Sequence, residues 1–274
     1  DQYADYTGLL QMGGDIAALN GMSAAEMQDF LKGRAPAATE EGFAQRSKNY
    51  AVLADRAGAI LRAREEDPGA YLYQQSPSVR EAYAALGEAQ TAEASTAAAQ
   101  RYAQVTLTES RRLGIQNPAI LPKAYADQLT AQFYRQEEGG EAAAVGIIAE
   151  RQKWGRYWPQ VFRQVAGELP GTAAVIGTGM RAGPAGRLAE LGQLKDDEVN
   201  KLLPAGMPPK DVRDAVRDEL ADFSLSVSGQ PGDARLMGMM DDATYRLAVS
   251  YVAQGKSASD AATLAAQERS EERF

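Results

Sequence analysis

The sequence contains no cysteine and no histidine in its 274 residues. Without cysteine, disulfides and thiolate metal sites are excluded. Without histidine, the chain lacks the commonest metal ligand and the commonest general base, which excludes Ser-His-Asp, Cys-His and histidine-based zinc chemistry. Catalysis would have to depend on carboxylates, lysine, tyrosine or a serine–lysine pair. We expect no cofactor and no metal site.

Long apolar runs and an excess of basic residues are also missing. No stretch reaches the 18 or so apolar residues of a transmembrane helix, so none is expected. The formal net charge is -8, which argues against specific nucleic-acid binding because that needs a basic surface. The chain begins at Asp1 rather than at Met and shows no signal segment. We interpret it as a piece of a longer protein or as a processed chain, with part of the function outside it.

The residues that are abundant favour helix. Alanine and straight-chain polar side chains dominate, and they lose little conformational freedom in a helix. No convincing alternating strand pattern occurs. The sequence therefore predicts an all-α fold, as a multi-helix bundle or an elongated helical array without significant sheet. The expected parts are N-terminal helices and a linker (1–42), a main helical domain (43–226) and a C-terminal helical hairpin (227–274).

Several helix boundaries can be predicted from local signals. Ser23 to Glu26 form a capping box, S-x-x-E. Apolar residues then recur at steps of three and four residues from Phe43 to Leu61, which predicts one long helix. A further helix is expected to open at "SPSV" (76–79) and to run to about Leu113.

The C-terminal half carries similar signals. A helix that carries Val145, Ile148 and Trp154 is predicted to run up to Pro159. Asp196 is expected to be the N-cap of the helix over "DEVNKLL". The last pair of helices is separated by Gly255, and Ser257 is expected to cap the second of them.

The stretch "AAVIGTGMRAG" (173–183) has the G-x-G-x-x-G/A spacing of a dinucleotide-binding turn. That turn works only between a strand and a helix of a βαβ unit, because the helix N-terminus holds the pyrophosphate. No second apolar strand follows, and Pro184 lies where the phosphate-binding helix should continue. We therefore favour a helix end and turn in which small residues let helices pack closely.

Two other groups of residues are candidates for function. Glu109 is followed by Ser110, which resembles part of a lytic transglycosylase motif, but "GLLQM" (8–12) lies upstream instead of downstream. Glu109 is thus the alternative catalytic candidate, and no catalytic residue is expected otherwise. Trp154, Tyr157 and Trp158 lie in the densest aromatic stretch and are possible interaction residues. For the two tryptophans we favour core packing over sugar, membrane or partner contact.

Four stretches together resemble the helical interior regions of large bacteriophage and prophage virion proteins, namely the internal virion or ejection proteins, many of which carry a lytic transglycosylase domain elsewhere. They are residues 62–83, 113–133, 150–180 and 241–268. The resemblance implies a non-catalytic structural role in virion assembly or in genome delivery across the host envelope. It implies other virion proteins or the chain's own subunits as partners, contact with the envelope or peptidoglycan, and location in the phage particle, or in the bacterial cytoplasm before assembly.

Two alternatives remain open at this point. The first is a muralytic, lytic transglycosylase-like helical domain that uses Glu109 or a neighbouring acid. The second is a bacterial helical adaptor that binds a protein partner. An acidic cleft near the tryptophans would favour the first, and a broad apolar groove would favour the second.

Overall fold

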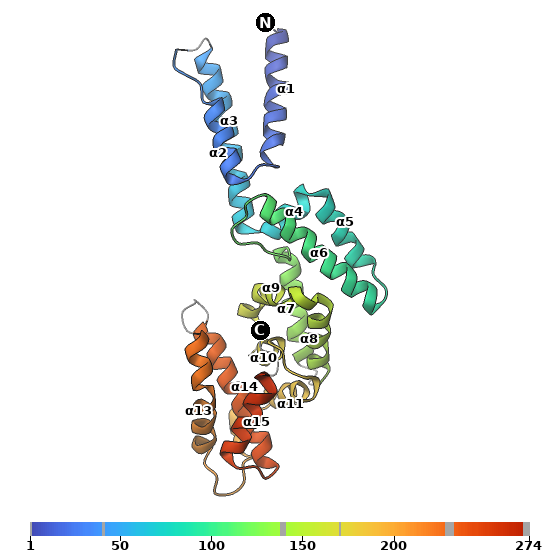
Figure 1. The fold of residues 1–274 in the computed structure, drawn as a ribbon, viewed down its shortest axis with the longest axis vertical. Coiled ribbons are helices and arrows are strands. Elements are labelled where there is room, and N and C mark those ends of the chain that lie inside the picture. The colour runs from blue at the N-terminus through green and yellow to red at the C-terminus, as the bar shows by residue number, and fades with distance from the viewer. Residues whose placement is uncertain (1, 40–41, 138–140, 170, 228–232, 271–274) are drawn as a thin grey trace. The chain divides into compact units, whose positions relative to one another are not determined.

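The computed structural model describes residues 2–39, 42–137, 141–169, 171–227 and 233–270, and all regular secondary structure within them is helical (Figure 1). The predicted all-α fold is confirmed. The chain divides into two compact units, Asp1–Ala124 and Tyr125–Phe274. This division falls inside the segment 43–226 that we expected to be one domain. The other expected boundary, at 226/227, adjoins residues 228–232, which lie outside the described residues.

The first unit is built from helices joined by short turns. They are α1 (Gln2–Leu19), α2 (Ala24–Arg34), α3 (Phe43–Glu66), α4 (Pro68–Gln75), α5 (Pro77–Glu88) and α6 (Ala92–Arg112), and α7 (Lys123–Glu137) begins here. The predicted capping box opens α2: the Ser23 backbone N–H donates to Glu26 Oε2 at 2.7 Å, and the Glu26 N–H donates to Ser23 Oγ at 3.3 Å. These hydrogen bonds lower the pKa of the Glu26 carboxyl.

The long helix predicted from residue 76 to about Leu113 is wrong, because the chain turns back on itself and forms α5 and α6. Thr91 begins α6, and its side chain accepts a hydrogen bond from the Ala94 N–H at 3.1 Å. The two helices pack together, with the Tyr83 and Tyr102 rings 5.5 Å apart in an edge-on arrangement. A hairpin buries one apolar face of each helix, which a single straight helix of this length cannot do by itself.

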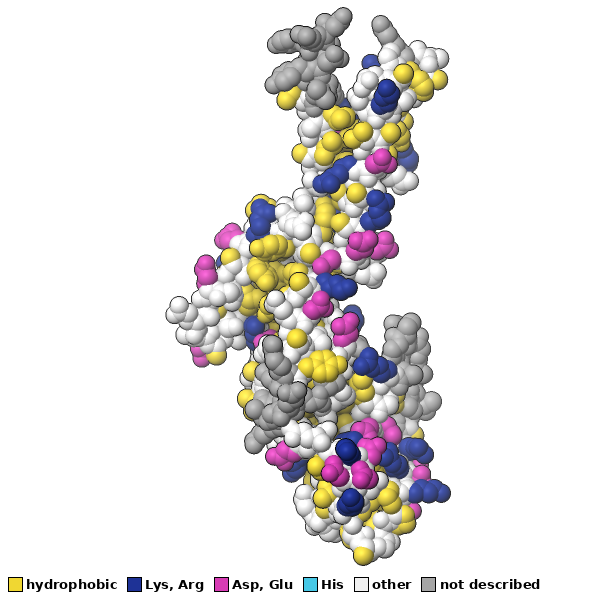
Figure 2. All heavy atoms as spheres, turned by 180° about the vertical axis from the view of Figure 1, so that it is seen from behind, with side chains coloured by type: hydrophobic (Ala, Val, Ile, Leu, Met, Phe, Trp, Pro, Cys, Tyr) yellow, Lys and Arg dark blue, Asp and Glu magenta, His cyan; other side chains and the backbone are white. Residues whose placement is uncertain are grey.

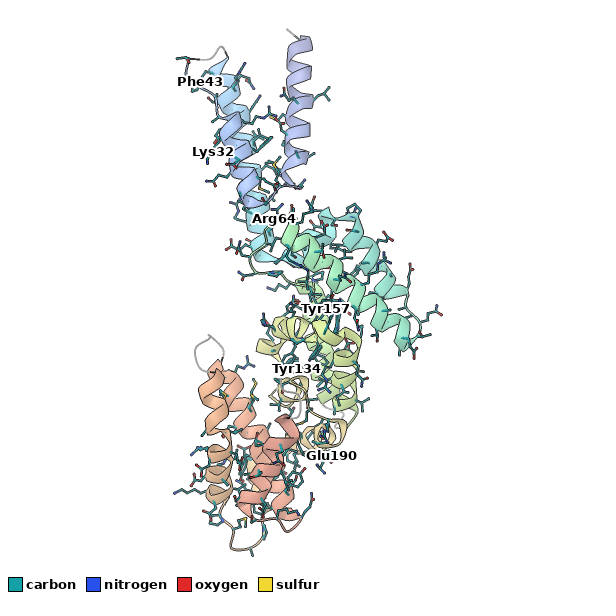
Figure 3. The ribbon with its side chains drawn as sticks, viewed as in Figure 1. Lys32, Phe43, Arg64, Tyr134, Tyr157 and Glu190 are labelled. Atoms are coloured by element: carbon teal, nitrogen blue, oxygen red, sulfur yellow. The ribbon has the colours of Figure 1, made fainter. Side chains whose placement is uncertain are left out.

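A buried arginine forms hydrogen bonds with the backbone just after α1 in this unit. The guanidinium of Arg64, on α3, donates to the Met22 carbonyl at 2.7 Å and to the Asn20 carbonyl at 3.1 Å (Figure 3). It also donates to the Tyr71 hydroxyl at 3.1 Å, and that hydroxyl donates to the Asn20 carbonyl at 3.0 Å. The last carbonyls of a helix have no partner within the helix. Arg64 therefore supplies the donors that the chain needs where α1 ends.

One aspartate side chain accepts hydrogen bonds from the N-termini of two helices. Asp67 Oδ1 accepts from the Ala70 N–H of α4 at 2.9 Å, and Oδ2 accepts from the Lys123 N–H of α7 at 3.1 Å. Gly69 makes this approach possible, because a Cβ at that position would lie 2.5 Å from the Leu121 carbonyl oxygen. A carboxylate at a helix N-terminus satisfies free N–H groups and complements the helix dipole. Here both oxygens of one side chain are used in this way.

The second unit contains the remainder of α7 and the helices that follow it. They are α8 (Glu141–Trp154), the 3-10 turn η1 (Gly155–Tyr157), α9 (Trp158–Val165), η2 (Ala166–Glu168), α10 (Gly171–Gly177), α11 (Ala182–Gly192), α12 (Asp196–Asn200), α13 (Pro209–Val227), α14 (Asp233–Ala253) and α15 (Ala258–Ser270). Helices α13, α14 and α15 pack against one another, and α10 and α11 pack against both α8 and α14. Ser257 caps α15 as predicted, by accepting from the Asp260 N–H at 3.1 Å.

A second buried arginine links α14 to the end of α11. Arg246 donates to the Leu191 and Leu194 carbonyls at 2.8 and 2.9 Å, and it forms ion pairs with Asp242 and Asp196 at 2.7 and 2.5 Å. Asp196 was predicted to be an N-cap, but Lys195 occupies that position and Asp196 is the first residue of α12. The Asp196 side chain forms an ion pair with Arg246 instead of capping the helix, because helix packing places the Arg246 guanidinium beside it.

Charged side chains are distributed without a single dominant patch on the face seen in Figure 2, where basic and acidic groups lie interspersed. Several of them pair along a helix or between neighbouring helices, as Arg34 does with Asp15 at 2.8 Å and Arg187 with Glu268 at 2.9 Å. Among the described residues, no helix combines the length and the apolar content that a membrane crossing requires.

Candidate functional site

The two tryptophans lie in the core of the second unit. Trp154 is 0% exposed and Trp158 is 4% exposed. The Trp154 indole N–H donates to Glu150 Oε2 at 3.0 Å, and the Trp158 indole N–H donates to the Gly177 carbonyl at 2.7 Å. A buried indole needs a hydrogen-bond acceptor as well as apolar contacts, and both side chains have one. Neither ring is therefore available as a surface for a sugar, membrane or protein partner.

The chain changes direction between these residues, which corrects the predicted helix up to Pro159. Helix α8 ends at Trp154, Gly155 adopts a φ of 52°, and α9 begins at Trp158. Pro159 lies in the first turn of α9, where a missing backbone N–H costs nothing. The left-handed backbone at Gly155 ends the helix, and the proline starts the next one.

Tyr157 is the member of the aromatic group that remains half-exposed. Its hydroxyl accepts a hydrogen bond from Arg156 Nη2 at 2.8 Å, and the Arg156 guanidinium lies 4.8 Å from the centre of its ring (Figure 3). An arginine over an aromatic ring is a favourable contact. The three aromatic residues thus form no common exposed face.

The G-x-G-x-x-A spacing is explained by helix packing. The residues before Gly177 form α10, not a strand, so the setting that a dinucleotide turn requires is not met. A Cβ at Gly177 would lie 2.3 Å from the Phe162 ring, so glycine allows α9 and α10 to approach. Gly179 adopts a φ of 131° in the turn to α11. Both glycines are therefore needed for the fold itself.

Glu109, the alternative catalytic candidate, lies on α6 beside a cavity of about 280 Å³ in the first unit. The cavity is also lined by Asn20, Gln75, Ser76 and Arg112. Glu109 Oε2 accepts hydrogen bonds from Arg112 Nε at 3.1 Å and Nη2 at 3.0 Å. A carboxylate bound in this way by a guanidinium is poorly placed to donate a proton to a glycosidic oxygen. The geometry therefore favours a structural ion pair.

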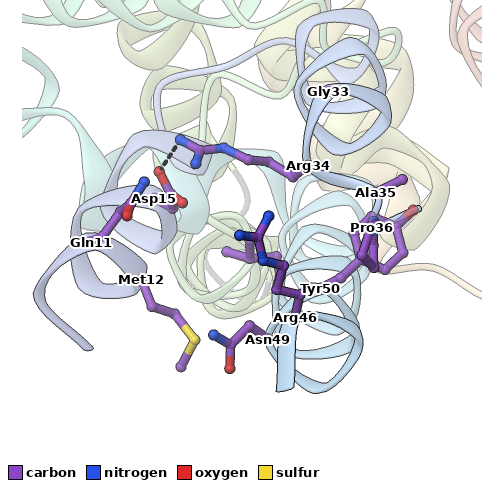
Figure 4. A pocket seen from close by; sticks show the side chains of 11 residues that line it. Gln11, Met12, Asp15, Gly33, Arg34, Ala35, Pro36, Arg46, Asn49 and Tyr50 are labelled. Carbon is purple, nitrogen blue, oxygen red and sulfur yellow. Dashed lines mark hydrogen bonds and ion pairs between the residues drawn. The ribbon is translucent and has the colours of Figure 1, made fainter. Parts of the chain in front are cut away.

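A larger cavity lies between α1, the end of α2 and the start of α3, where no residue was predicted to be functional (Figure 4). Its volume is about 490 Å³. Polar and charged side chains line much of it, among them Gln11, Asp15, Arg34, Arg46 and Asn49. Arg34 and Asp15 pair across it at 2.8 Å. These residues are up to 38 positions apart, and no sequence signal brings them together.

A third polar group joins α11, α14 and α15 in the second unit. Arg187 Nη2 donates to the Tyr251 hydroxyl at 2.7 Å and to Glu268 Oε1 at 2.9 Å. Burial, together with the nearby Glu268 carboxylate, raises the pKa of Tyr251 to about 12. The tyrosine therefore stays neutral and can donate to the carboxylate while it accepts from the arginine. This arrangement stabilises the contact between the three helices.

The described residues contain no group of three or more acidic side chains that could hold a metal ion. Comparison with known proteins gives no further indication: no protein family, no characterised protein and no solved structure matches this chain. Any function must therefore be inferred from the chain's own residues.

Proposed function

We propose that this chain is a non-catalytic structural segment of a phage-derived internal virion or ejection protein, acting in virion assembly or in genome delivery across the host envelope. The observation that carries the proposal is the resemblance of four stretches to the helical interior of such proteins. In the structure these stretches cover the end of α3 with α4 and the first part of α5, the connection from α6 to α7 with most of α7, the end of α8 through α10, and most of the α14–α15 pair. Both units thus contain segments with the resemblance.

The way the helices pack is consistent with passage through a narrow channel. Helices α14 and α15 bury small side chains, including Ala243, Ala248, Ala261, Ala262 and Ala265. Because hydrophobic stabilisation scales with the apolar area removed from water, each alanine contributes less than a larger side chain would. The chain also has no cysteine, so no disulfide has to be reduced before unfolding. Such helices can unfold and refold without a covalent step.

The proposed partners are other virion proteins or further copies of the chain, with contact to the envelope or peptidoglycan during delivery. The proposed location is the phage particle, preceded by the bacterial cytoplasm before assembly. The residues that suggested chemistry have structural contacts, since Trp158 and Gly177 form one packing unit and Glu109 pairs with Arg112. These contacts support a role in packing and assembly.

The two alternatives have weaker support. Glycan cleavage would depend on Glu109, which lines a cavity but is bound by Arg112. An adaptor would need an apolar groove, whereas the cavity between α1, α2 and α3 contains the Arg34–Asp15 ion pair. A structural role therefore remains the proposal.

The test is the composition of phage particles produced from the genome that encodes the chain. We expect mass spectrometry to detect the chain in purified particles, and to find it depleted after DNA release and present in the envelope fraction of the infected cells. The major capsid protein, which stays in the emptied particle, is the control. Absence of the chain from particles, or its full retention after DNA release, would contradict the proposal.

A further inference from the structure

The charge of Arg64 is balanced differently from that of Arg246. Arg64 is 5% exposed, and its partners are the Met22 and Asn20 carbonyls, the Tyr71 hydroxyl and the Tyr71 ring, whose centre lies 4.9 Å from the guanidinium. Across the described parts of the chain, no carboxylate forms an ion pair with it. Arg246, which is comparably buried, has two, from Asp242 and Asp196. A buried cation without a counter-charge is unfavourable unless something else compensates it.

The hydrogen bonding of Arg64 is also incomplete. A guanidinium carries five N–H donors and remains charged at all physiological pH values. Nε of Arg64 is buried and has no acceptor among the described residues. Leaving a buried donor without a partner is costly, and such a group in a native structure requires an explanation. The guanidinium of Arg64 therefore keeps an unpaired donor as well as a positive charge without a counter-ion.

Arg64 forms part of the wall of a cavity of about 220 Å³ in the first unit. Leu61, Leu113 and Ile115 contribute apolar walls, and Leu61 is 39% exposed. Cavities that hold drug-sized molecules measure roughly 300–1,000 Å³, so this one suits a smaller ligand. The cavity therefore combines a buried cation with apolar surface in a small space.

We propose that this cavity binds a small aliphatic carboxylate, with its alkyl part against Leu61, Leu113 and Ile115 and its carboxylate directed to Arg64. Burying the alkyl part removes apolar surface from water, and the carboxylate supplies the missing counter-charge. Glu65 also lines the cavity and repels anions. An alkyl carboxylate is favoured over phosphate because phosphate has no apolar part to bury against Leu61, Leu113 and Ile115. This inference is independent of the proposed virion role.

The binding test uses the full chain and isothermal titration calorimetry, with hexanoate as the probe. We expect saturable binding of hexanoate, and binding at least tenfold weaker for 1-hexanol, which has the same alkyl chain without the charge. Inorganic phosphate is expected to bind more weakly than hexanoate. Non-saturable binding of hexanoate, or equal binding of hexanol, would overturn the proposal.

Variants locate the site without disturbing the fold. Leu61→Glu adds a negative charge at the exposed edge of the cavity and should weaken hexanoate binding at least tenfold. Val52→Glu is the matched control, because Val52 is a 45% exposed residue of the same helix outside the cavity. Glu65→Gln should tighten binding severalfold. Equal effects of Leu61→Glu and Val52→Glu would place binding elsewhere and refute the proposal.

The same chemistry can come from a short fatty acid or from the C-terminal residue of a peptide. N-acetyl-leucine represents the peptide source, and N-acetyl-leucinamide is its uncharged control. Tighter binding of N-acetyl-leucine than of hexanoate supports the site with a peptide C-terminus as its ligand, and the reverse order supports it with a short fatty acid. Equal binding of N-acetyl-leucine and its amide would contradict a carboxylate site.

Discussion

The Trp158 region of the second unit and the Arg64 region of the first unit contrast in how their side chains are used. Trp158 and Gly177 belong to stretches with conspicuous sequence patterns, yet both are used in packing: the Trp158 indole N–H donates to the Gly177 carbonyl at 2.7 Å, and Phe162 occupies the place of the missing Gly177 Cβ. Arg64 belongs to an ordinary charged stretch of α3. It nevertheless lies at a cavity, with a buried Nε that has no acceptor among the described residues.

The contrast shows that an unusual residue pattern in the sequence does not by itself indicate a ligand-binding site. Large aromatic side chains and glycines at fixed spacing are also what close helix packing requires, because one fills volume and the other allows approach. A ligand-binding site needs polar or charged groups whose hydrogen bonds or charges are not satisfied within the protein. Several buried polar atoms meet this condition, Arg187 Nε among them, but Arg64 meets it as a cation without a counter-ion beside a cavity, and the tryptophans do not meet it.

The largest effect is expected from Trp158→Ala, which tests whether the Trp158 region is core. Removing a buried tryptophan should lower the free energy of unfolding by about 3–5 kcal/mol, because it leaves a cavity and an unpaired Gly177 carbonyl. Thermal unfolding followed by circular dichroism measures the loss. Trp158→Phe keeps most of the volume and should cost less. An unchanged melting temperature for Trp158→Ala, with red-shifted and readily quenched tryptophan emission in the unaltered chain, would assign these residues to a surface.

Gly177→Ala should have an intermediate effect and separates packing from nucleotide binding. The added Cβ would lie 2.3 Å from the Phe162 ring, so that ring or the helices that carry the two residues must shift, at a cost of about 1–3 kcal/mol. Gly183→Ala is the matched control, because a Cβ there meets nothing within 4 Å and the residue lies in α11. Urea denaturation compares the two. Equal stabilities, or NAD binding detected by calorimetry in the unaltered chain, would contradict the packing explanation.

The smallest effect is expected from Glu109→Gln, which tests the first unit for catalysis. The ion pair with Arg112 has side chains that are 20% and 53% exposed, and pairs of this kind contribute about 1 kcal/mol or less. The melting temperature should therefore fall only slightly. In a turbidity assay with purified peptidoglycan, neither the unaltered chain nor the variant is expected to clear the suspension. Clearing by the unaltered chain that Glu109→Gln abolishes would establish the muralytic alternative.

Much of the local structure could be predicted because its causes are local. The capping box at Ser23, the cap at Ser257 and the long helix starting at Phe43 depend on residues a few positions apart, and all three are present. The errors have a common origin. The turn at 89–91 within the expected long helix and the Arg246 contact of Asp196 arise from helices that meet in space.

By itself, the sequence determined the all-α class, several helix starts and the exclusion of cysteine- and histidine-based chemistry, because helix propensity, capping and composition act over a few residues. Only the tertiary structure decided which side chains are buried and which buried polar groups lack a hydrogen-bond partner. Arg64 meets the carbonyls of Asn20 and Met22 across more than forty residues, and the cavity beside it forms from α3 and the turn after α6. Such contacts depend on how whole helices pack, and no short sequence pattern records them.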